Sequence, residues 1–151
     1  MDEDFHPALF TSHESVEQAY YDALDRADLE AVMGCWAEED EIVCIHPNGA
    51  RLVGHDAIRR SYAAIVQNGS VPIRPLAMHV QPGMMVSVHS LVEQVVVRDA
   101  EGTTAAAHVF ATNIYAKTPS GWRMVLHHAS HVATEALPEA LMDSPRPSIL
   151  H

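Results

Sequence analysis

Hydrophobic residues in the first half of the chain recur with the period of an α-helix. The first apolar stripe consists of Val16, Ala19, Tyr20, Ala23 and Leu24. It lies beside two overlapping capping-box patterns, Thr11-x-x-Glu14 and Ser15-x-x-Gln18, which are typical of a helix start. Asp28 is a suitable N-cap for a second helix, and a third opens at Gly54 and Asp56. The pattern therefore predicts three helices.

The second half of the chain changes to the alternation of β-strands and is rich in Val, Thr, Tyr and Phe. Four long segments of this kind cover residues 71–81, 84–98, 105–117 and 122–133. Turn-forming stretches with Gly or Pro separate them, so the sheet is predicted to be an antiparallel meander. Residues 41–46 and 50–53, on either side of Pro47-Asn48-Gly49, add a short hairpin.

The faces of two long strands bear on function. In the last strand, the bulkier and more apolar face, which we expect to point inward, holds Trp122, Met124, Leu126, His128 and Ser130. In residues 84–98 both alternating faces are apolar, and Glu93 could pair with His128 or lie outside the fold. Helices can cover only one face of a sheet. We therefore expect a second copy of the chain to cover the outer face, which gives a homodimer.

Composition and charge exclude several classes of function. The chain has 151 residues, which suits one domain, and 9 Lys+Arg against 20 Asp+Glu give a net charge of −11. Such a chain, without a basic cluster, is not expected to bind nucleic acid or an anionic membrane. It has no apolar run of about 18 residues and starts with acidic residues, so neither a membrane helix nor a signal peptide is predicted. Cys35 and Cys44 are interpreted as reduced, partly buried thiols of a cytoplasmic protein.

Three stretches, in their order and spacing, resemble the nuclear transport factor 2-like superfamily, especially its SnoaL-like members. They are Ala23 to Val32 with Trp36; His46-Pro47-Asn48-Gly49 through Gly54-His55-Asp56-Ala57-Ile58; and Ala111-Thr112-Asn113-Ile114-Tyr115 followed by Gly121-Trp122-Arg123 and His127-His128-Ala129-Ser130. The resemblance implies an α+β cone, in which a curved antiparallel sheet of four long strands plus a short hairpin wraps around three helices and leaves an internal pocket. We expect this domain to span residues 12–135, with flexible tails at 1–11 and 136–151.

The ketosteroid isomerase branch of that superfamily suggests which residues face the pocket. Its active-site Tyr precedes the Asp that caps the second helix by eight residues, as Tyr20 precedes Asp28 here. Its general-base Asp directly precedes the hairpin Pro, where this chain has His46, and its second oxyanion donor corresponds to Asn113. The resemblance implies His46 as a base, with Tyr20 and Asn113 as donors to an enolate oxygen. Because both of the family's Asp residues are replaced, the steroid reaction itself is not implied.

Each of these residues also has a purely structural alternative. Tyr20 could be a core aromatic, His46 could cap the hairpin, and Asn113 could satisfy buried backbone groups. The residues expected to line the pocket are Trp36, Tyr62, Tyr115, Trp122, Met124 and His128. No metal site is predicted, because His127 and His128 point to opposite faces of their strand, while His127 and His131 stand about 13 Å apart.

Two functions remain open from the sequence. The first is a pocket for an unknown small organic ligand, in an isomerase, cyclase or dehydratase that acts by proton transfer next to a carbonyl. No nucleotide-binding motif is present, so no cofactor is expected. The alternative is a non-catalytic ligand-binding or oligomerisation module. The superfamily also includes such a module, the association domain of calcium/calmodulin-dependent kinase, so fold alone does not decide.

Overall fold

A computed structural model describes residues 9–102 and 104–132. Within them lie three helices and six strands. The helices are α1 (His13–Asp25), α2 (Leu29–Gly34) and α3 (His55–Val66). The strands are β1 (Val43–Ile45), β2 (Arg51–Val53), β3 (Ile73–Gln81), β4 (Val86–Arg98), β5 (Thr104–Thr118) and β6 (Gly121–His131). The order of helices, short hairpin and four long strands is the one predicted.

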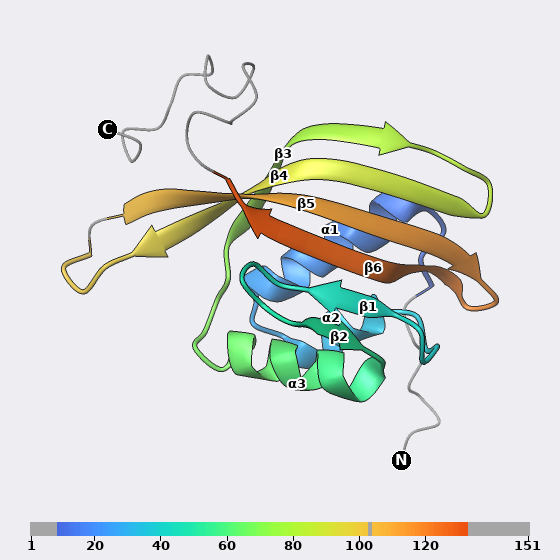
Figure 1. Ribbon diagram of the computed structural model, residues 1–151, viewed down its shortest axis with the longest axis horizontal. Coiled ribbons are helices and arrows are strands. Elements are labelled where there is room, and N and C mark those ends of the chain that lie inside the picture. The colour runs from blue at the N-terminus through green and yellow to red at the C-terminus, as the bar shows by residue number, and fades with distance from the viewer. Residues whose placement is uncertain (1–8, 103, 133–151) are drawn as a thin grey trace.

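One sheet holds all six described strands, in the order β2-β1-β6-β5-β4-β3. The long strands β3 to β6 form the antiparallel meander, while β1 pairs in parallel with β6 and antiparallel with β2. The sheet is curved and unclosed; α1 runs along its inner face, α2 lies behind the short hairpin, and α3 lies beside β2 (Figure 1). This arrangement confirms the predicted α+β fold class.

Short polar side chains begin the first two helices. Ser12 caps α1, because its Oγ accepts a hydrogen bond from the Ser15 backbone N at 3.0 Å and the Ser15 Oγ lies 3.2 Å from the Ser12 backbone N. The observed capping box therefore consists of Ser12 and Ser15 and differs from both predicted ones, Thr11-x-x-Glu14 and Ser15-x-x-Gln18. Asp28 caps α2 as predicted, with its Oδ1 accepting from the Ala31 backbone N at 3.1 Å.

A β-bulge in β6 decides which histidine points inward. The pairs on either side of the bulge are Ile114–Leu126 and Tyr115–Met124. Val125 has no residue opposite it, and this extra residue reverses the alternation of the strand. As a result Met124 and His127 are both buried, at 0% and 3% exposure. His128 is exposed, so the prediction that it points inward with Met124 is wrong.

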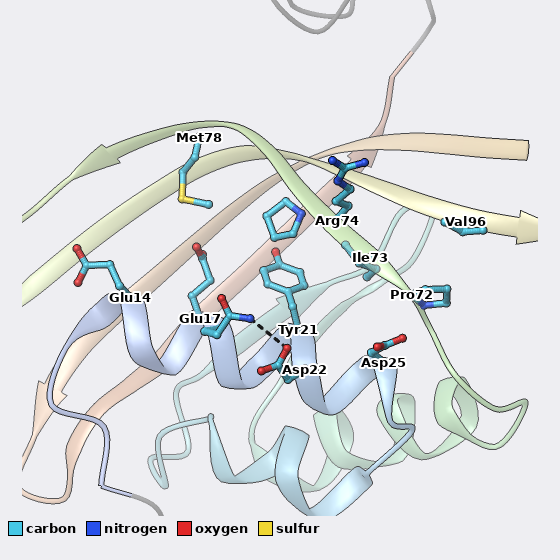
Figure 2. A pocket seen from close by; sticks show the side chains of 12 residues that line it. Glu14, Glu17, Tyr21, Asp22, Asp25, Pro72, Ile73, Arg74, Met78 and Val96 are labelled. Atoms are coloured by element: carbon cyan, nitrogen blue, oxygen red, sulfur yellow. Dashed lines mark hydrogen bonds between the residues drawn. The ribbon is translucent and has the colours of Figure 1, made fainter. Parts of the chain in front are cut away.

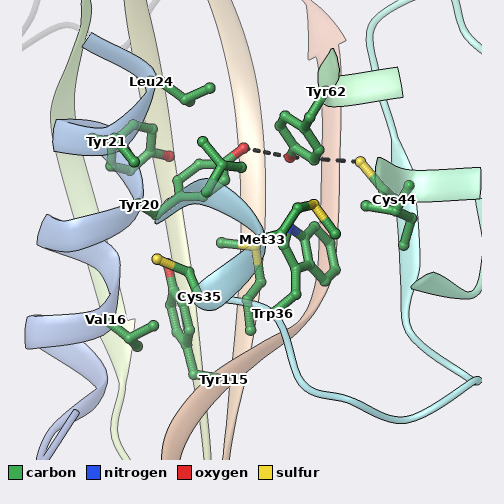
Figure 3. Close-up of a cluster of buried hydrophobic side chains, with 14 of the residues drawn as sticks. Val16, Tyr20, Tyr21, Leu24, Met33, Cys35, Trp36, Cys44, Tyr62 and Tyr115 are labelled. Carbon is green, nitrogen blue, oxygen red and sulfur yellow. Dashed lines mark hydrogen bonds between the residues drawn. The ribbon is translucent and has the colours of Figure 1, made fainter. Parts of the chain in front are cut away.

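Aromatic side chains from different elements meet in the core (Figure 3). Tyr20, Trp36, Tyr62 and Tyr115 are each at most 2% exposed. The Tyr20 and Tyr62 rings meet edge to face with their centroids 6.1 Å apart, and Trp36 lies 6.3 Å from Tyr62. Burial of each large side chain stabilises the fold by about 2 to 3 kcal/mol, so this cluster holds α1 and α3 against the sheet.

The outer face of the sheet is partly apolar. The β4 residues His89 and Glu93 contact α1, so the residues that alternate with them point away from the helices. On that outer face Phe110 is 39% and Val86 is 51% exposed. Neighbouring strands thus carry apolar side chains that no helix covers.

Phe10, which lies within the predicted N-terminal tail, pairs with a strand of the sheet. The Phe10 carbonyl accepts a hydrogen bond from the Trp122 backbone N at 2.9 Å, so Phe10 is bound to β6 although the predicted tail was 1–11. Residues 1–8 and 136–151 of the predicted tails lie outside the described residues. Within the described part, no helix has the length and apolar character needed to cross a membrane.

Candidate functional site

A cavity of about 260 Å³ opens between α1, α3 and the inner face of the sheet. Its wall is mostly apolar and includes Leu24, Ile65, Val71, Ile73, Val95, Ala107, Val109 and Ala129. The polar residues in the wall are Tyr20, His46, Tyr62, Glu93, His127 and His131. An apolar hollow with a few polar groups is typical of small-molecule sites, and this volume is slightly below the range of about 300 to 1,000 Å³ for such sites.

Two buried tyrosines form a hydroxyl chain in the cavity wall. The hydroxyl oxygens of Tyr20 and Tyr62 are 2.6 Å apart, and the Cys44 Sγ lies 3.7 Å from that of Tyr62 (Figure 3). When the thiol donates to Tyr62 and Tyr62 donates to Tyr20, the Tyr20 proton is left for a ligand. Burial raises the pKa of both phenols, so both keep their protons at neutral pH.

His46, directly after β1, presents one acceptor nitrogen. Its Nε2 lies 3.1 Å from the Ser61 Oγ, and the Ser61 hydroxyl donates its only proton to the Ile58 carbonyl at 2.8 Å. The Nε2 therefore carries the ring proton and donates to Ser61, which leaves the Nδ1 as an acceptor. Burial lowers the pKa of His46, so the ring is neutral at neutral pH.

His127 lies deeper in the same wall, on β6. Its ring centroid is 5.7 Å from that of Tyr20 and 6.2 Å from that of His46. Its Nδ1 is 2.6 Å from the Oδ1 of Asn113. Burial, reinforced by the nearby His46 and His128, lowers the pKa of His127 to about 3, so its imidazole is neutral at neutral pH.

Asn113 stands behind His127 rather than in the cavity wall. Its side-chain amide Nδ2 donates to the Glu17 Oε2 at 3.2 Å and to the Tyr21 hydroxyl at 3.0 Å. With its oxygen next to His127, the whole amide is used by protein partners. Asn113 is therefore placed to orient His127, and it does not reach a ligand directly.

Glu17 on α1 anchors this buried polar network. Its Oε2 accepts a hydrogen bond from the Tyr115 hydroxyl at 2.8 Å and lies 2.9 Å from the Nδ1 of His89. Burial disfavours the charged form, but the contacts with His89, Tyr115 and Asn113 outweigh it and lower the pKa of Glu17. The group is thus a carboxylate that can only accept hydrogen bonds.

Glu93 on β4 is the functional candidate that sequence reasoning could not place. It lines the cavity, is 4% exposed, and its Oε2 accepts a hydrogen bond from the Tyr21 hydroxyl at 2.7 Å. Burial raises the pKa of Glu93 to about 7, so the carboxyl group can gain or lose a proton at neutral pH. The only sign in the sequence was a single acidic residue inside an apolar strand.

Glu93→Gln is expected to stabilise the protein at alkaline pH. The Glu93 pKa rises from 4.5 to about 7 on folding, so wild-type stability falls as the pH rises through that window. At pH about 8 the variant should gain up to about 3 kcal/mol in unfolding free energy, and near pH 4.5 almost nothing. Urea unfolding at both pH values measures this, with the exposed Glu101→Gln as a control. A gain that does not depend on pH would contradict it.

Comparison with known proteins identifies the family to which this chain belongs. Residues 14–135 match the model of the SnoaL-like domain. The chain belongs to the SnoaL-like family. No curated protein matches it in sequence.

Solved structures with the SnoaL-like architecture carry different assignments. One from Thiobacillus denitrificans ATCC 25259, provisionally assigned as a calcium/calmodulin-dependent protein kinase type II association domain, is 31% identical, with a TM-score of 0.74 over 83% of this chain and 99% of that one. One from Streptomyces avermitilis, provisionally assigned as a dehydratase of the NTF2-like family, is 27% identical, with a TM-score of 0.72 over 80% and 94%. The association domain of C. elegans CaMKII shares the fold, at 19% identity, a TM-score of 0.64 and coverage of 78% and 91%.

The SnoaL-like cavity brings together only some of the residues expected from the sequence. Tyr20, His46 and Tyr62 line it, whereas Asn113 lies behind His127. The other residues expected in the wall do not line it: Trp36, Tyr115, Trp122 and Met124 pack in the core, and His128 is exposed. Large aromatic residues fill the core because they bury the most apolar area there.

A larger hollow lies on the other side of Tyr21, between α1 and β3 (Figure 2). It measures about 580 Å³, and Glu14, Asp22 and Asp25 face Arg74 across it. These four charged side chains are exposed, while Glu17 and Tyr21, which also line the hollow, are already engaged in hydrogen bonds with protein groups. The smaller cavity has buried acid, base and donor groups within an apolar wall, and we therefore take it as the candidate site.

The cysteines add no reactive group to the site. Cys44 lies 3.4 Å from the Nε2 of His46, but burial raises the pKa of its thiol to about 12. Burial also raises the pKa of Cys35 to about 12. Both remain protonated at neutral pH and are poor nucleophiles. Across residues 9–102 and 104–132, no three His, Cys, Asp or Glu side chains are grouped so that they could hold a metal ion.

Proposed function

We propose that this SnoaL-like protein is a cofactor-independent enzyme that moves a proton next to the carbonyl group of a small, mostly apolar molecule. The supporting observation is that Glu93, a buried carboxyl group whose pKa is raised to about 7, and the buried phenol of Tyr20 line one apolar cavity. The similarity to the Streptomyces avermitilis protein favours an isomerase- or dehydratase-type reaction.

In the proposed reaction, Tyr20 binds the carbonyl oxygen and Glu93 transfers the proton. The Glu93 carboxylate takes a proton from the carbon next to the carbonyl. The electrons of that C–H bond form an enolate, whose oxygen accepts the Tyr20 hydrogen bond. The protonated Glu93 then returns the proton to the same carbon or to a conjugated one, which moves the double bond. No atom is gained or lost, so the step needs no cofactor.

We propose Glu93 as the base in preference to His46, the base expected from the sequence. Burial lowers the pKa of His46, and it lowers that of His127 to about 3, which makes both rings weaker proton acceptors. A general base works best when its pKa is near the working pH, as for Glu93. His46 is the second candidate base, and we assign ligand orientation to His127, which Asn113 holds in place.

Exchange of carbon-bound hydrogen tests this function. Cyclohexanone and 2-cyclohexenone are incubated with the full chain in D₂O, and loss of their α-hydrogen signals is followed by NMR. The wild type is expected to speed this loss in proportion to its concentration. A chain carrying both Glu93→Gln and Tyr20→Phe is expected to match buffer alone. Equal rates for the two proteins, or no acceleration by either, would count against the proposal.

A second function, self-association, is favoured by the apolar outer face of the sheet. Phe110 and Val86 leave apolar surface uncovered there, and two copies apposed at this face would bury it. The 31% identical protein from Thiobacillus denitrificans, provisionally assigned as an association domain, supports this direction. Such a role needs the outer face and not the cavity, so both functions are compatible.

Phe110→Asp is expected to convert a dimer into a monomer. A buried carboxylate at an apolar contact loses its hydration without gaining a partner, which is costly. Light scattering after size-exclusion chromatography gives the mass of each protein. Met84→Asp is the control, because Met84 is 88% exposed in the turn between β3 and β4, and it should stay dimeric. A wild type that is monomeric at every concentration would refute the dimer.

A further inference from the structure

One atom in the cavity wall lacks a partner although its side chain is almost completely buried. His127 is 3% exposed, and its Nδ1 is occupied by Asn113 at 2.6 Å. The hydrogen bonds found among residues 9–102 and 104–132 engage only the Nδ1 of this ring and not its other nitrogen, Nε2. It points away from Asn113 because the two nitrogens lie on opposite sides of the ring, and His127 lines the cavity. The Nε2 is thus available to a ligand.

Two independent contacts fix which way the Asn113 amide faces. The Glu17 carboxylate, at 3.2 Å from Nδ2, can only accept a hydrogen bond. The Tyr21 hydroxyl, at 3.0 Å, gives its only proton to Glu93 and so also accepts from Nδ2. Turning the amide over would place its oxygen against both acceptors. The Asn113 Oδ1 therefore faces His127.

An amide oxygen next to the Nδ1 dictates the form of the histidine ring. The Oδ1 can only accept, so the His127 Nδ1 must carry the proton. A neutral imidazole has only one N–H, and the Nε2 is then a lone-pair acceptor. A carboxylate on α1 thus sets the hydrogen-bonding character of a ring on β6, through one amide on β5.

We propose that Asn113 is a positioning residue that holds His127 as the Nδ1–H tautomer, so that the Nε2 accepts a hydrogen bond from a hydroxyl or amine N–H of the ligand. This inference rests on the proposed function for its second half: Tyr20 donates to the ligand's carbonyl oxygen, and His127 accepts from a donor elsewhere on the same molecule. The ligand class is therefore a small carbonyl compound that also carries a hydroxyl or amino group.

The tautomer is tested directly on the wild type. Long-range ¹H–¹⁵N correlation spectra of the full chain labelled at histidine nitrogen distinguish the protonated from the bare ring nitrogen. The chain has 11 histidines, and loss of one signal set in His127→Phe assigns His127. We expect a protonated Nδ1 and a bare Nε2 at neutral pH. A protonated Nε2 would overturn the proposal, and this result needs no folded Asn113 variant.

Asn113→Leu tests the role of the amide. With no acceptor beside the Nδ1, His127 is expected to lose its single tautomer and to show a population with a protonated Nε2. An unchanged Nδ1–H tautomer in this variant would show that Asn113 does not set it. If Asn113→Leu does not fold, the wild-type spectrum still decides the tautomer.

The ligand class is tested with two probes, 3-hydroxycyclohexanone and its methyl ether 3-methoxycyclohexanone. NMR titration of the wild type is expected to give about three- to tenfold tighter binding of the hydroxyl compound, the contribution of one hydrogen bond. His127→Phe should reduce this ratio to near one, because it keeps a ring and removes the acceptor. His46→Phe removes a different one of the three imidazoles in the wall, and the preference for the hydroxyl compound should persist in it.

The outcomes separate this inference from the proposed function. A ratio that survives in His127→Phe or collapses only in His46→Phe overturns the assignment of His127, and so does equal or undetectable binding of both probes by the wild type. If the tautomer and the ratio are as expected but no α-hydrogen exchanges, the proposed catalysis fails while the ligand class stands. If α-hydrogen exchange occurs but His127 does not carry its proton on the Nδ1, the proposed catalysis stands and the inference about His127 fails.

Discussion

Glu93→Gln is expected to slow α-hydrogen exchange by about 10²- to 10⁴-fold, the usual contribution of a general base. Glutamine keeps the length of the side chain and can still accept the Tyr21 hydrogen bond, so the cavity should retain its shape. What is lost is the carboxylate that takes the proton. The rate in D₂O, followed by NMR on cyclohexanone, measures the effect.

The pH dependence identifies the base more sharply than the rate alone. Only the ionised carboxylate can accept a proton, and the Glu93 pKa is about 7. The wild-type rate, corrected for buffer, is therefore expected to rise with pH through about 7 and then to level off. In Glu93→Gln this step should disappear, whereas His46→Gln should keep it and lose less activity. If His46→Gln removes the step and Glu93→Gln does not, the base is His46.

Glu93→Gln is expected to change activity and stability in opposite directions. A carboxyl group that is 4% exposed costs folding free energy when it ionises, and that same burial brings its pKa near neutrality. The variant should therefore be the less active and, above neutral pH, the more stable protein. A merely structural glutamate would show neither the rate loss nor this pairing.

Tyr20→Phe is expected to lower the exchange rate by about 10²- to 10³-fold, the cost of losing one preorganised donor to a developing oxyanion. The ring remains and continues to pack against Tyr21 and Tyr62, whose centroids lie 4.9 and 6.1 Å from it. Because the hydrogen bond strengthens as negative charge develops, kcat should fall more than KM changes. Steady-state exchange rates over a range of cyclohexanone concentrations separate the two.

Tyr62→Phe is the matched control for that measurement. It removes the hydroxyl 2.6 Å behind Tyr20 but leaves the Tyr20 proton available to the ligand. Support through a hydrogen-bond chain is worth less than the direct bond, so the loss should stay below about tenfold. Equal losses in the two variants would mean that the pair acts only through packing, and the oxyanion role of Tyr20 would be wrong.

The helices and strands could be predicted because local patterns specify them. The apolar stripe from Val16 to Leu24, the cap at Asp28 and the Gly- and Pro-containing turns each act within a few residues. Family resemblance at two short motifs pointed to Tyr20 and His46, and both line the cavity. Their chemical roles remain predictions until exchange is measured.

The polar network could not be predicted in the same way. Asn113 donates to Glu17, which is 96 residues away in the chain, and no local pattern links the two. The alternation of a strand sequence also cannot reveal a bulge. Because Val125 is unpaired, His127 points inward and His128 outward, the reverse of the prediction. Whether the Glu93 side chain is buried or exposed depends on the register of β4 against β5 and on the hydrogen bond from the Tyr21 hydroxyl.

The sequence by itself determined the order and type of the elements and the α+β class, because helix and strand periods are properties of neighbouring residues. Only the tertiary structure decided which polar groups share the cavity, since that depends on strand register and on hydrogen bonds between distant elements. A carboxyl group becomes a candidate base when the surrounding apolar wall removes its water, and that wall comes from segments spread over more than half the chain.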